Sequence, residues 1–126
     1  MTTLVEALNA RNYELLKAFM DQTFVFGFWQ SQGYATTPDL AIETLKINYL
    51  GPSTHLTPDP GKDLVALLGR DPYELMGFNS TNAQVLFVSG WGPAGTDEAI
   101  LYITSRPDGS PYWHGVLIAL GGFVHP

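Results

Sequence analysis

The dipeptide Asp108-Gly109 constrains the fold more than any other feature of this 126-residue chain, because it lies between two runs of alternating apolar residues. Asp-Gly favours the tight two-residue turn that joins neighbouring antiparallel strands. The flanking runs, 98–105 and 112–120, are therefore predicted to pair as a hairpin. A third run, 83–91, precedes them after a short glycine-rich loop and extends the hairpin to a three-stranded meander.

A turn centred on Asp108-Gly109 pairs Leu101 with Val116 and Ile103 with His114. Because successive side chains of a strand point to opposite faces of the sheet, this register assigns each residue of the meander to one face. The face that we expect to meet the helices carries the more apolar set, which is Val85, Phe87, Ser89, Trp91, Ala99, Leu101, Ile103, Tyr112, His114, Val116 and Ile118.

The opposite face of the meander carries Ile100, Tyr102, Trp113 and Leu117 beside a few polar side chains. A contiguous apolar patch of this kind marks an interaction surface when it is exposed. Charged residues make up only 14% of the chain, well below the roughly 25% of an average protein. We therefore predict a two-fold homodimer in which two sheets pack face to face.

The first part of the chain is predicted to hold two helical regions, with one Phe-rich strand between them in the sequence. Helical spacing of apolar residues predicts a helix over 3–20. Near Asn12 we expect either a kink or a division into two short helices, with Asn12 as the cap of the second. Residues 23–30 alternate as a strand does. Thr37, followed by a proline, is a suitable N-cap for a second helix over 38–50.

Residues 51–82 hold several prolines and glycines, and they are predicted to be largely irregular. A short helix at 64–68 and a turn at Asp71-Pro72 are expected within them. A long irregular segment in a small domain often forms a lid or rim. We therefore expect this segment to border a binding site.

Length and charge bound the class of protein. Residues 1–126 suffice for one domain, and the net charge of −6 excludes a basic nucleic-acid surface or a polybasic membrane patch. There is no cysteine, which excludes thiolate metal sites, and neither a metal nor a cofactor is expected. The chain has neither a signal-peptide pattern nor an apolar segment of ~18 residues, so we expect no membrane partner and a cytoplasmic location.

Helices followed by an antiparallel meander form an α+β pattern. With the opening segment Leu4–Tyr13 and the final-strand residues Tyr112–Gly115, this order resembles the nuclear-transport-factor-2-like superfamily, especially its SnoaL-like branch, which has a cystatin-like α+β cone fold. The resemblance implies N-terminal helices packed on a strongly curved antiparallel sheet, a cone-shaped pocket between them and frequent sheet-to-sheet dimers. It implies no single chemistry, because this fold hosts isomerases, hydrolases, cyclases and non-catalytic binding proteins.

His114 is the first candidate for chemistry, because the predicted register places it on the face toward the helices. One interpretation is a general acid or base in the pocket. The other is a buried neutral histidine that is part of the core. A buried imidazole far from a carboxylate should have a pKa below the usual ~6.5.

His55 and Asp59 are two weaker catalytic candidates at the start of the irregular segment. They could form an acid–base dyad, or join His114 as metal ligands. Because their spacing does not bring them to one side outside a helix, a polar rim residue and a turn-forming aspartate are the simpler interpretation.

A glycine pattern and a set of aromatic residues complete the candidates. Residues 90–95 match the pattern G-x-G-x-x-G, but a strand follows them, so a hairpin loop is expected rather than a dinucleotide site. Trp and Tyr side chains combine apolar area with a polar group, which suits the wall of a site for a small apolar ligand. The residues predicted to line it are Trp29, Tyr34, Ser89, Trp91 and Tyr112.

The sequence thus leaves three functions open. The first is a domain that binds a small hydrophobic molecule. The second is a SnoaL-like or ketosteroid-isomerase-like enzyme that performs acid–base chemistry on a polyketide-, terpene- or steroid-like substrate. The third is a dimeric protein-interaction module. A carboxylate close to His114 in a closed pocket would favour the enzyme, and a wall of aromatic and aliphatic side chains would favour the binding domain.

Overall fold

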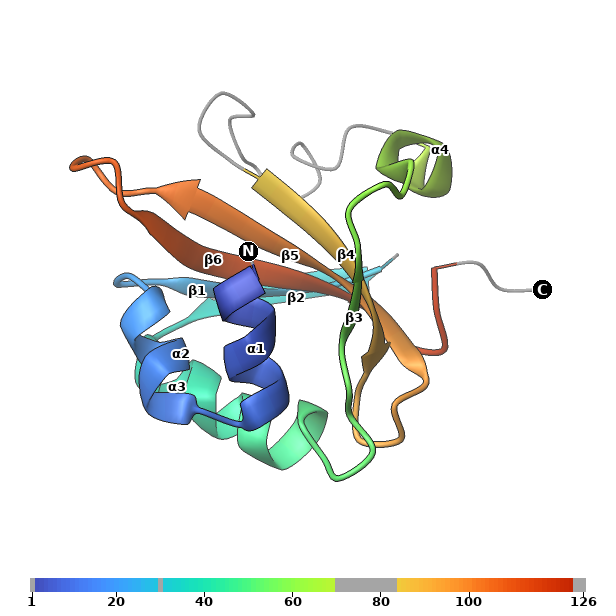
Figure 1. Cartoon of the computed structure of the whole chain (residues 1–126), viewed down its shortest axis with the longest axis horizontal. Coiled ribbons are helices and arrows are strands. Elements are labelled where there is room, and N and C mark those ends of the chain that lie inside the picture. The colour runs from blue at the N-terminus through green and yellow to red at the C-terminus, as the bar shows by residue number, and fades with distance from the viewer. Residues whose placement is uncertain (1, 30, 70–83, 124–126) are drawn as a thin grey trace.

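The computed structural model describes residues 2–29, 31–69 and 84–123. Figure 1 shows the helices α1, α2 and α3 gathered on one side of the sheet, whereas α4 lies apart from them. The elements in chain order are α1 (Thr2–Ala10), α2 (Tyr13–Phe19), β1 (Phe24–Phe28), β2 (Ser31–Thr36), α3 (Pro38–Thr44), the π-helical turn η1 (Leu45–Tyr49), β3 (Thr57–Asp59), α4 (Leu64–Leu68), β4 (Gln84–Trp91), β5 (Asp97–Ser105) and β6 (Pro111–Ala119).

The N-terminal helix breaks where the sequence predicts. α1 ends at Ala10 and α2 begins at Tyr13. Between them, Arg11 adopts a left-handed φ of 57°, and the Asn12 side chain accepts a hydrogen bond from the backbone N–H of Leu15 at 3.2 Å. Asn12 is thus the N-cap of α2, and this prediction is confirmed.

The helix predicted over 38–50 forms with its predicted cap, but it changes type along its length. Thr37 Oγ1 accepts a hydrogen bond from the backbone N–H of Leu40 at 3.4 Å, which confirms Thr37 as the N-cap. From Leu45 the backbone widens into a π-helical turn, at whose end the N–H of Leu50 donates to the Leu45 carbonyl at 2.8 Å. Turns of this type are frequent at functional sites.

Replacing Thr37 by alanine is expected to lower the free energy of unfolding by about 1 kcal/mol, because the N–H of Leu40 loses its acceptor at the start of α3. Thr36→Ala, just outside the cap, serves as the control and should cost less. Urea unfolding of both variants measures the difference. Equal losses would place the start of the helix elsewhere.

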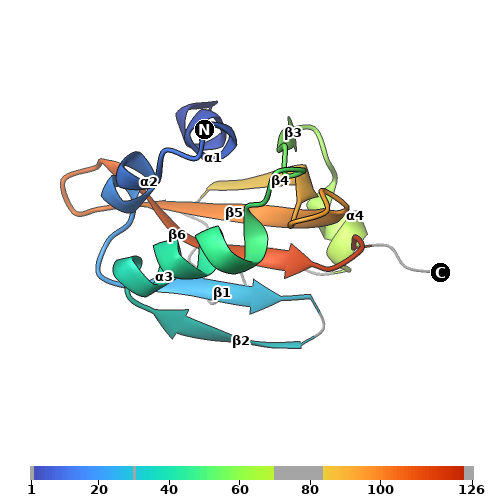
Figure 2. The ribbon, with the colours of Figure 1, turned by 90° about the horizontal axis from the view of Figure 1, so that it is seen from below.

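The sheet is mixed, whereas an antiparallel sheet was predicted. The described strands lie in the order β2-β1-β6-β5-β4-β3, and β1 runs parallel to β6, with Val25 beside Gly115. Figure 2 shows these two strands pointing the same way. One edge of β1 pairs with β2, so its other edge accepts the last strand, whose direction is already set by the meander. The α+β class is confirmed, and its sheet is open.

Both edge strands, β2 and β3, are absent from the prediction. β2 shows no apolar alternation, and β3 is only three residues long and contains a proline, which an edge strand tolerates. The short helix α4 forms at the predicted residues, with Asp63 as its N-cap. The predicted turn at Asp71-Pro72 lies outside the described residues.

The pairing of β5 with β6 follows the predicted register only in part. Leu101 pairs with Val116 as predicted, but Ile103 pairs with Trp113 instead of His114. His114 is the extra residue of a β-bulge, which shifts the register by one. Trp113 therefore turns toward the helices, where it is buried in the core, and its predicted place on the opposite face is wrong.

β4 pairs with β5 one residue away from the predicted register, since Leu86 lies opposite Leu101 and Val88 opposite Ala99. A slip of one residue exchanges the two faces of a strand. Leu86 and Val88 therefore pack beneath the helices. Three residues that the sequence assigned to this side lie on the other face, and they are Val85, Phe87 and Ser89.

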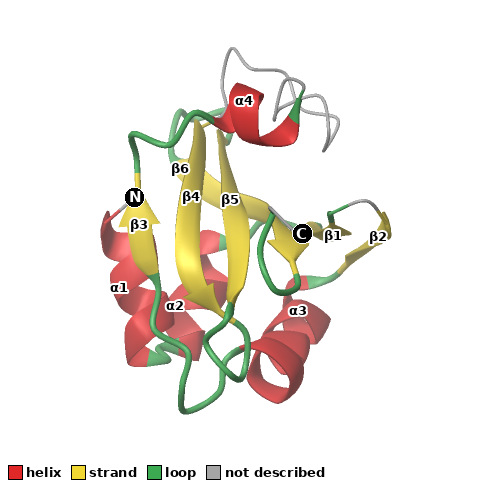
Figure 3. Ribbon diagram, turned by 90° about the vertical axis from the view of Figure 1, so that its right-hand side faces the viewer, coloured by secondary structure: helices red, strands yellow, loops and turns green. Residues whose placement is uncertain are grey.

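Hydrophobic clusters fill both sides of the sheet. The larger one lies between the sheet and α1, α2 and α3. The second contains Phe87, Ile100, Tyr102 and Leu117, and it is covered by α4 and by Phe123 near the end of the described chain. Figure 3 shows α4 on the side remote from α1, α2 and α3. The prediction that this face is exposed is therefore wrong, and the homodimer stays a prediction without this support.

Candidate functional site

A row of aromatic side chains runs along the helix side of the sheet toward its β2 edge. Ring centroids lie 5.5 Å apart for Phe26 and Tyr34 and 6.4 Å apart for Phe28 and Tyr34. Tyr49 lies 5.7 Å from Phe26 and 6.1 Å from Trp91. We name these five residues the aromatic row. Because Tyr34 is 46% exposed and Trp91 is fully buried, the aromatic row leads from the surface into the core.

Two structural units position the outer part of the aromatic row. One is the strand pair β1 and β2, and the other is the helical segment α3–η1 that packs over it. Phe26 lies directly opposite Tyr34 in the antiparallel pair, which puts both rings on one face of the sheet. Figure 2 shows α3 and the turn that follows it lying along β1 on this side. The π-helical turn η1 ends at Tyr49, whose ring packs over Phe26.

Tyr49 remains a hydrogen-bond donor at neutral pH. Burial raises the pKa of its hydroxyl above the usual value, and the neighbouring hydroxyl of Tyr34 raises it further. Both tyrosines therefore bring O–H groups to an otherwise apolar wall.

Trp91 reaches the aromatic row because of a bulge at Gly90. The register of β4 shifts between Ser89 and Trp91, and Gly90 has a left-handed φ of 81°. A side chain at Gly90 would collide with the backbone carbonyl of His55. The bulge turns Trp91 to the helix side, which confirms its predicted face. Among the described residues, no acceptor lies within hydrogen-bonding distance of the buried Trp91 Nε1.

A buried threonine ties η1 to the loop after β4. The Thr54 hydroxyl lies within hydrogen-bonding distance of the carbonyl oxygens of Tyr49, at 3.1 Å, and of Gly92. It also accepts a hydrogen bond from the N–H of Gly51 at 2.9 Å. These bonds hold the backbone of Tyr49 close to that of Trp91, its neighbour in the aromatic row.

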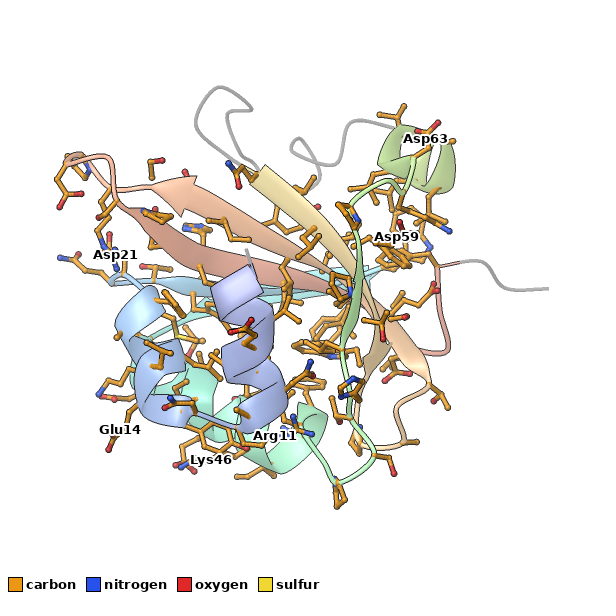
Figure 4. All side chains as sticks on the ribbon, viewed as in Figure 1. Arg11, Glu14, Asp21, Lys46, Asp59 and Asp63 are labelled. Atoms are coloured by element: carbon orange, nitrogen blue, oxygen red, sulfur yellow. The ribbon has the colours of Figure 1, made fainter. Side chains whose placement is uncertain are left out.

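Arg11 holds the same segment to the N-terminal helices. Its guanidinium donates hydrogen bonds to the carbonyl oxygens of Leu8 at 2.7 Å, Gly51 at 2.6 Å and Thr54 at 2.7 Å. Figure 4 shows Arg11 at the end of α1, next to the segment that follows η1. A planar, always charged guanidinium suits this role, because it serves several carbonyl groups at once.

Solved structures of other proteins share the overall fold. A DUF4783 family protein from Bacteroides ovatus matches with a TM-score of 0.60 and 10% identity, over 92% of this chain and 90% of its own. An NTF2-like protein of unknown function from Cytophaga hutchinsonii matches with a TM-score of 0.53 and 11% identity, over 91% of this chain and 80% of its own. The fold is nuclear-transport-factor-2-like.

The resemblance predicted from the sequence is thus confirmed for the fold. Another DUF4783 family protein, from Bacteroides uniformis, has a TM-score of 0.59 and 10% identity, with 91% of each chain covered. No protein-family model matches this chain, and no curated protein matches it in sequence. At this level of identity the likeness extends to the fold alone, so the SnoaL-like branch stays a prediction.

Within this nuclear-transport-factor-2-like fold, two of the five predicted ligand-binding residues belong to the aromatic row, and these are Tyr34 and Trp91. Trp29 packs in the second cluster, where its ring lies 5.7 Å from that of Phe123. Ser89 and Tyr112 lie on the face away from the helices. Tyr49 is absent from the predicted ligand-binding residues, because its helical spacing from Ile42 and Leu45 predicts a buried helix face that packs on the core.

His114 and Tyr112 form a separate group at the bulge of β6. Their rings lie 5.7 Å apart, and the Arg106 guanidinium lies 5.4 Å from the centre of the Tyr112 ring. Burial lowers the pKa of His114, and the negative charge of Asp21 opposes this effect in part. His114 is thus held toward its neutral form.

A histidine titration by NMR should place the pKa of His114 below the usual ~6.5, because burial disfavours the imidazolium. A lowered folded-state pKa means that the unfolded chain takes up the proton first. The fold should therefore lose stability as the pH falls below ~6.5. His114→Gln assigns the resonance and removes this part of the pH dependence. A midpoint at or above ~6.5 would contradict the burial of His114.

The structure does not bring the other catalytic candidates to His114. His55 and Asp59 are exposed, and the backbone N–H of His55 donates to the carbonyl of Gly90 at 3.2 Å. Figure 4 shows Asp59 on the opposite side of the molecule from Asp21, the carboxylate that acts on His114. The structure therefore assembles no dyad from these residues.

The described part of the chain holds no cluster of three or more metal-ligating side chains. The residues of the G-x-G-x-x-G pattern end β4 and form the loop to β5, where a dinucleotide site would need a helix. No described helix has the length and apolar character needed to cross a bilayer.

Proposed function

We propose that this domain binds a small, largely apolar molecule against the aromatic row. The observation that carries the proposal is the continuity of aromatic rings from the exposed Tyr34 to the buried Trp91. Sites for small molecules are lined mainly by apolar and aromatic side chains, with a few polar groups that orient the ligand. Here those groups are the hydroxyls of Tyr34 and Tyr49.

The alternative function, an acid–base enzyme, receives less support from the residues of the aromatic row and its surroundings. A general base must lie within hydrogen-bonding reach of the proton that it removes. No Asp or Glu side chain is fully buried among the described residues, so no buried carboxylate supports the aromatic row. His114, the main catalytic candidate, lies at the bulge of β6 beside Tyr112, outside the aromatic row. SnoaL-like chemistry therefore stays the alternative, and binding is the function that we propose.

Naphthalene, a flat apolar probe, tests this proposal through its fluorescence. The purified protein is expected to bind naphthalene, and Tyr34→Ala is expected to weaken the affinity about tenfold, because one aromatic wall of the site is lost. Tyr34 is half exposed, so its removal should leave the fold intact, which circular dichroism verifies.

Tyr112→Ala is the matched control. Tyr112 is also a partly exposed tyrosine of the sheet, but it lies outside the aromatic row, beside His114. Its replacement should leave naphthalene binding unchanged. Absence of binding to the unaltered protein, or an equal loss in both variants, would contradict a site at the aromatic row.

A further inference from the structure

The edge strand β2 lacks the features by which edge strands avoid further pairing. It is the last strand at one side of the described sheet, and Figure 2 shows it at the border of the ribbon with no described element beyond it. An edge strand offers N–H and C=O groups to any other strand, so edges normally carry charges or proline, or are very short. β2 has six residues, with neither a charge nor a proline among them.

The opposite edge strand, β3, has these protective features. It has only three residues, and they include Pro58 and Asp59. The proline has no N–H to donate, and the carboxylate keeps a charge at this edge. Pairing through β2 therefore joins two copies and stops there, because the far edge of each copy does not accept another strand.

The distribution of charge also distinguishes the hairpin of β1 and β2. Residues 22–38 form a run of 17 residues without Asp, Glu, Lys, Arg or His, although charged residues make up 14% of the chain. With a net charge of −6, two copies of the chain repel each other on average. The uncharged β2 edge is a place where two copies can meet without this repulsion.

We propose that β2 pairs antiparallel with β2 of a second copy, which gives a two-fold homodimer with one continuous sheet. Antiparallel pairing of two identical strands is self-complementary, as a two-fold axis requires. The register of β1 and β2 shifts only between Phe26 and Phe28, so Tyr34, Ala35 and Thr36 pair regularly with β1. This part of β2 thus has the regular backbone that a further strand needs. The contact lies at the edge of the sheet, and the face covered by α4 takes no part in it.

The partner copy adds a ring to the aromatic row. Tyr34 lies near the middle of β2 and is 46% exposed. When two copies of β2 pair over their length, Tyr34 lies opposite or diagonal to the partner's Tyr34 on the same side of the sheet, within reach of aromatic side chains. In its own copy Tyr34 already contacts Phe26 and Phe28. The dimer therefore joins the exposed ends of the two aromatic rows.

Opposite charges introduced at Ala35 test the pairing. Ala35 is an exposed residue of β2 outside the aromatic row. Sedimentation equilibrium of the unaltered protein, over a micromolar concentration series without ligand, should show monomer and dimer and no larger species. Ala35→Lys and Ala35→Glu should each weaken the dimer about tenfold, because like charges meet near the two-fold axis. An equimolar mixture of the two variants should recover the dimer, because opposite charges then meet.

Thr57→Lys is the matched control, because Thr57 is an exposed residue of the other edge strand, β3. It makes the same change in net charge and should leave the dimer intact, and circular dichroism verifies that all variants fold. An unaltered protein that stays monomeric would overturn the proposal. A dimer that tolerates both charges at Ala35, or a mixture that stays monomeric, would overturn it as well.

The proposed dimer and the proposed function fail in different ways. The assembly is measured without ligand, so a monomeric protein that still binds naphthalene would refute the dimer and leave the binding site. A dimer that binds no naphthalene would refute the proposed function and leave the pairing of β2.

Discussion

Gly90→Ala is expected to destabilise the fold by about 4 kcal/mol, which combines the strain of a left-handed alanine with overpacking against backbone. Gly90 has a φ of 81°, and an added Cβ would meet the carbonyl oxygen of His55. This carbonyl belongs to backbone and cannot rotate away as a side chain would. The same collision would displace the bulge that turns Trp91 into the aromatic row.

Gly109→Ala separates the backbone strain of a left-handed alanine from the overpacking against the backbone of His55. Gly109 has a similar φ of 87°, but nothing lies within 4 Å of a Cβ placed there. This variant should therefore show the backbone strain alone, about 1–2 kcal/mol. Urea unfolding of both variants measures the difference. Equal losses would mean that the backbone at His55 moves aside readily, and the close approach at Gly90 would then not hold Trp91 in place.

Arg11→Gln is expected to lower the free energy of unfolding by about 3 kcal/mol, because charged hydrogen bonds contribute more than neutral ones and their loss leaves carbonyl groups unsatisfied. The guanidinium joins Leu8 to Gly51 and Thr54, so it connects α1 to the segment after η1. The loss should reduce naphthalene affinity as well as stability, because Thr54 holds the end of η1 at Tyr49.

Lys17→Gln is the control for the loss of a positive charge. Lys17 Nζ lies 2.5 Å from Asp39 Oδ1, but both side chains are more than half exposed. Exposed ion pairs contribute about 0–1 kcal/mol. If Arg11→Gln costs no more than Lys17→Gln in urea unfolding, Arg11 does not hold these segments together.

Local signals made the helix boundaries predictable. Asn12 and Thr37 cap helices at the predicted positions, because a side-chain oxygen satisfies N–H groups only a few residues away along the chain. The Asp108-Gly109 turn likewise joins β5 and β6 as predicted. In each case the interacting groups are close in sequence, so the residues alone determine the outcome.

The pairing of distant segments followed no such signal. The parallel contact of β1 with β6 joins Val25 to Gly115 across most of the chain. Its formation depends on where α3 and the meander lie, and no residue of β1 specifies it. β2 has a weak strand pattern, and it forms because β1 offers it an edge.

The candidate site shows the same difference between what local sequence signals predict and what the pairing of distant segments decides. Residue types pointed to Tyr34 and Trp91, because aromatic side chains with a polar group suit a ligand wall. Bulges decided the faces: the one at His114 sent Trp113 into the core, and the one at Gly90 brought Trp91 back to the helix side. A bulge changes the register by one residue and thereby reverses every side chain beyond it.

The sequence by itself determined the α+β class, the capped helices and the final hairpin, since these depend on periodicity and on contacts within a few residues. Only the tertiary structure decided which face of the sheet is buried by α4 and Phe123, and which rings meet at Tyr49. Those outcomes depend on bulges, on a π-helical turn and on contacts such as Arg11 with Thr54. Their stability comes from groups far apart in the chain, so the folded packing selects them and local preference does not.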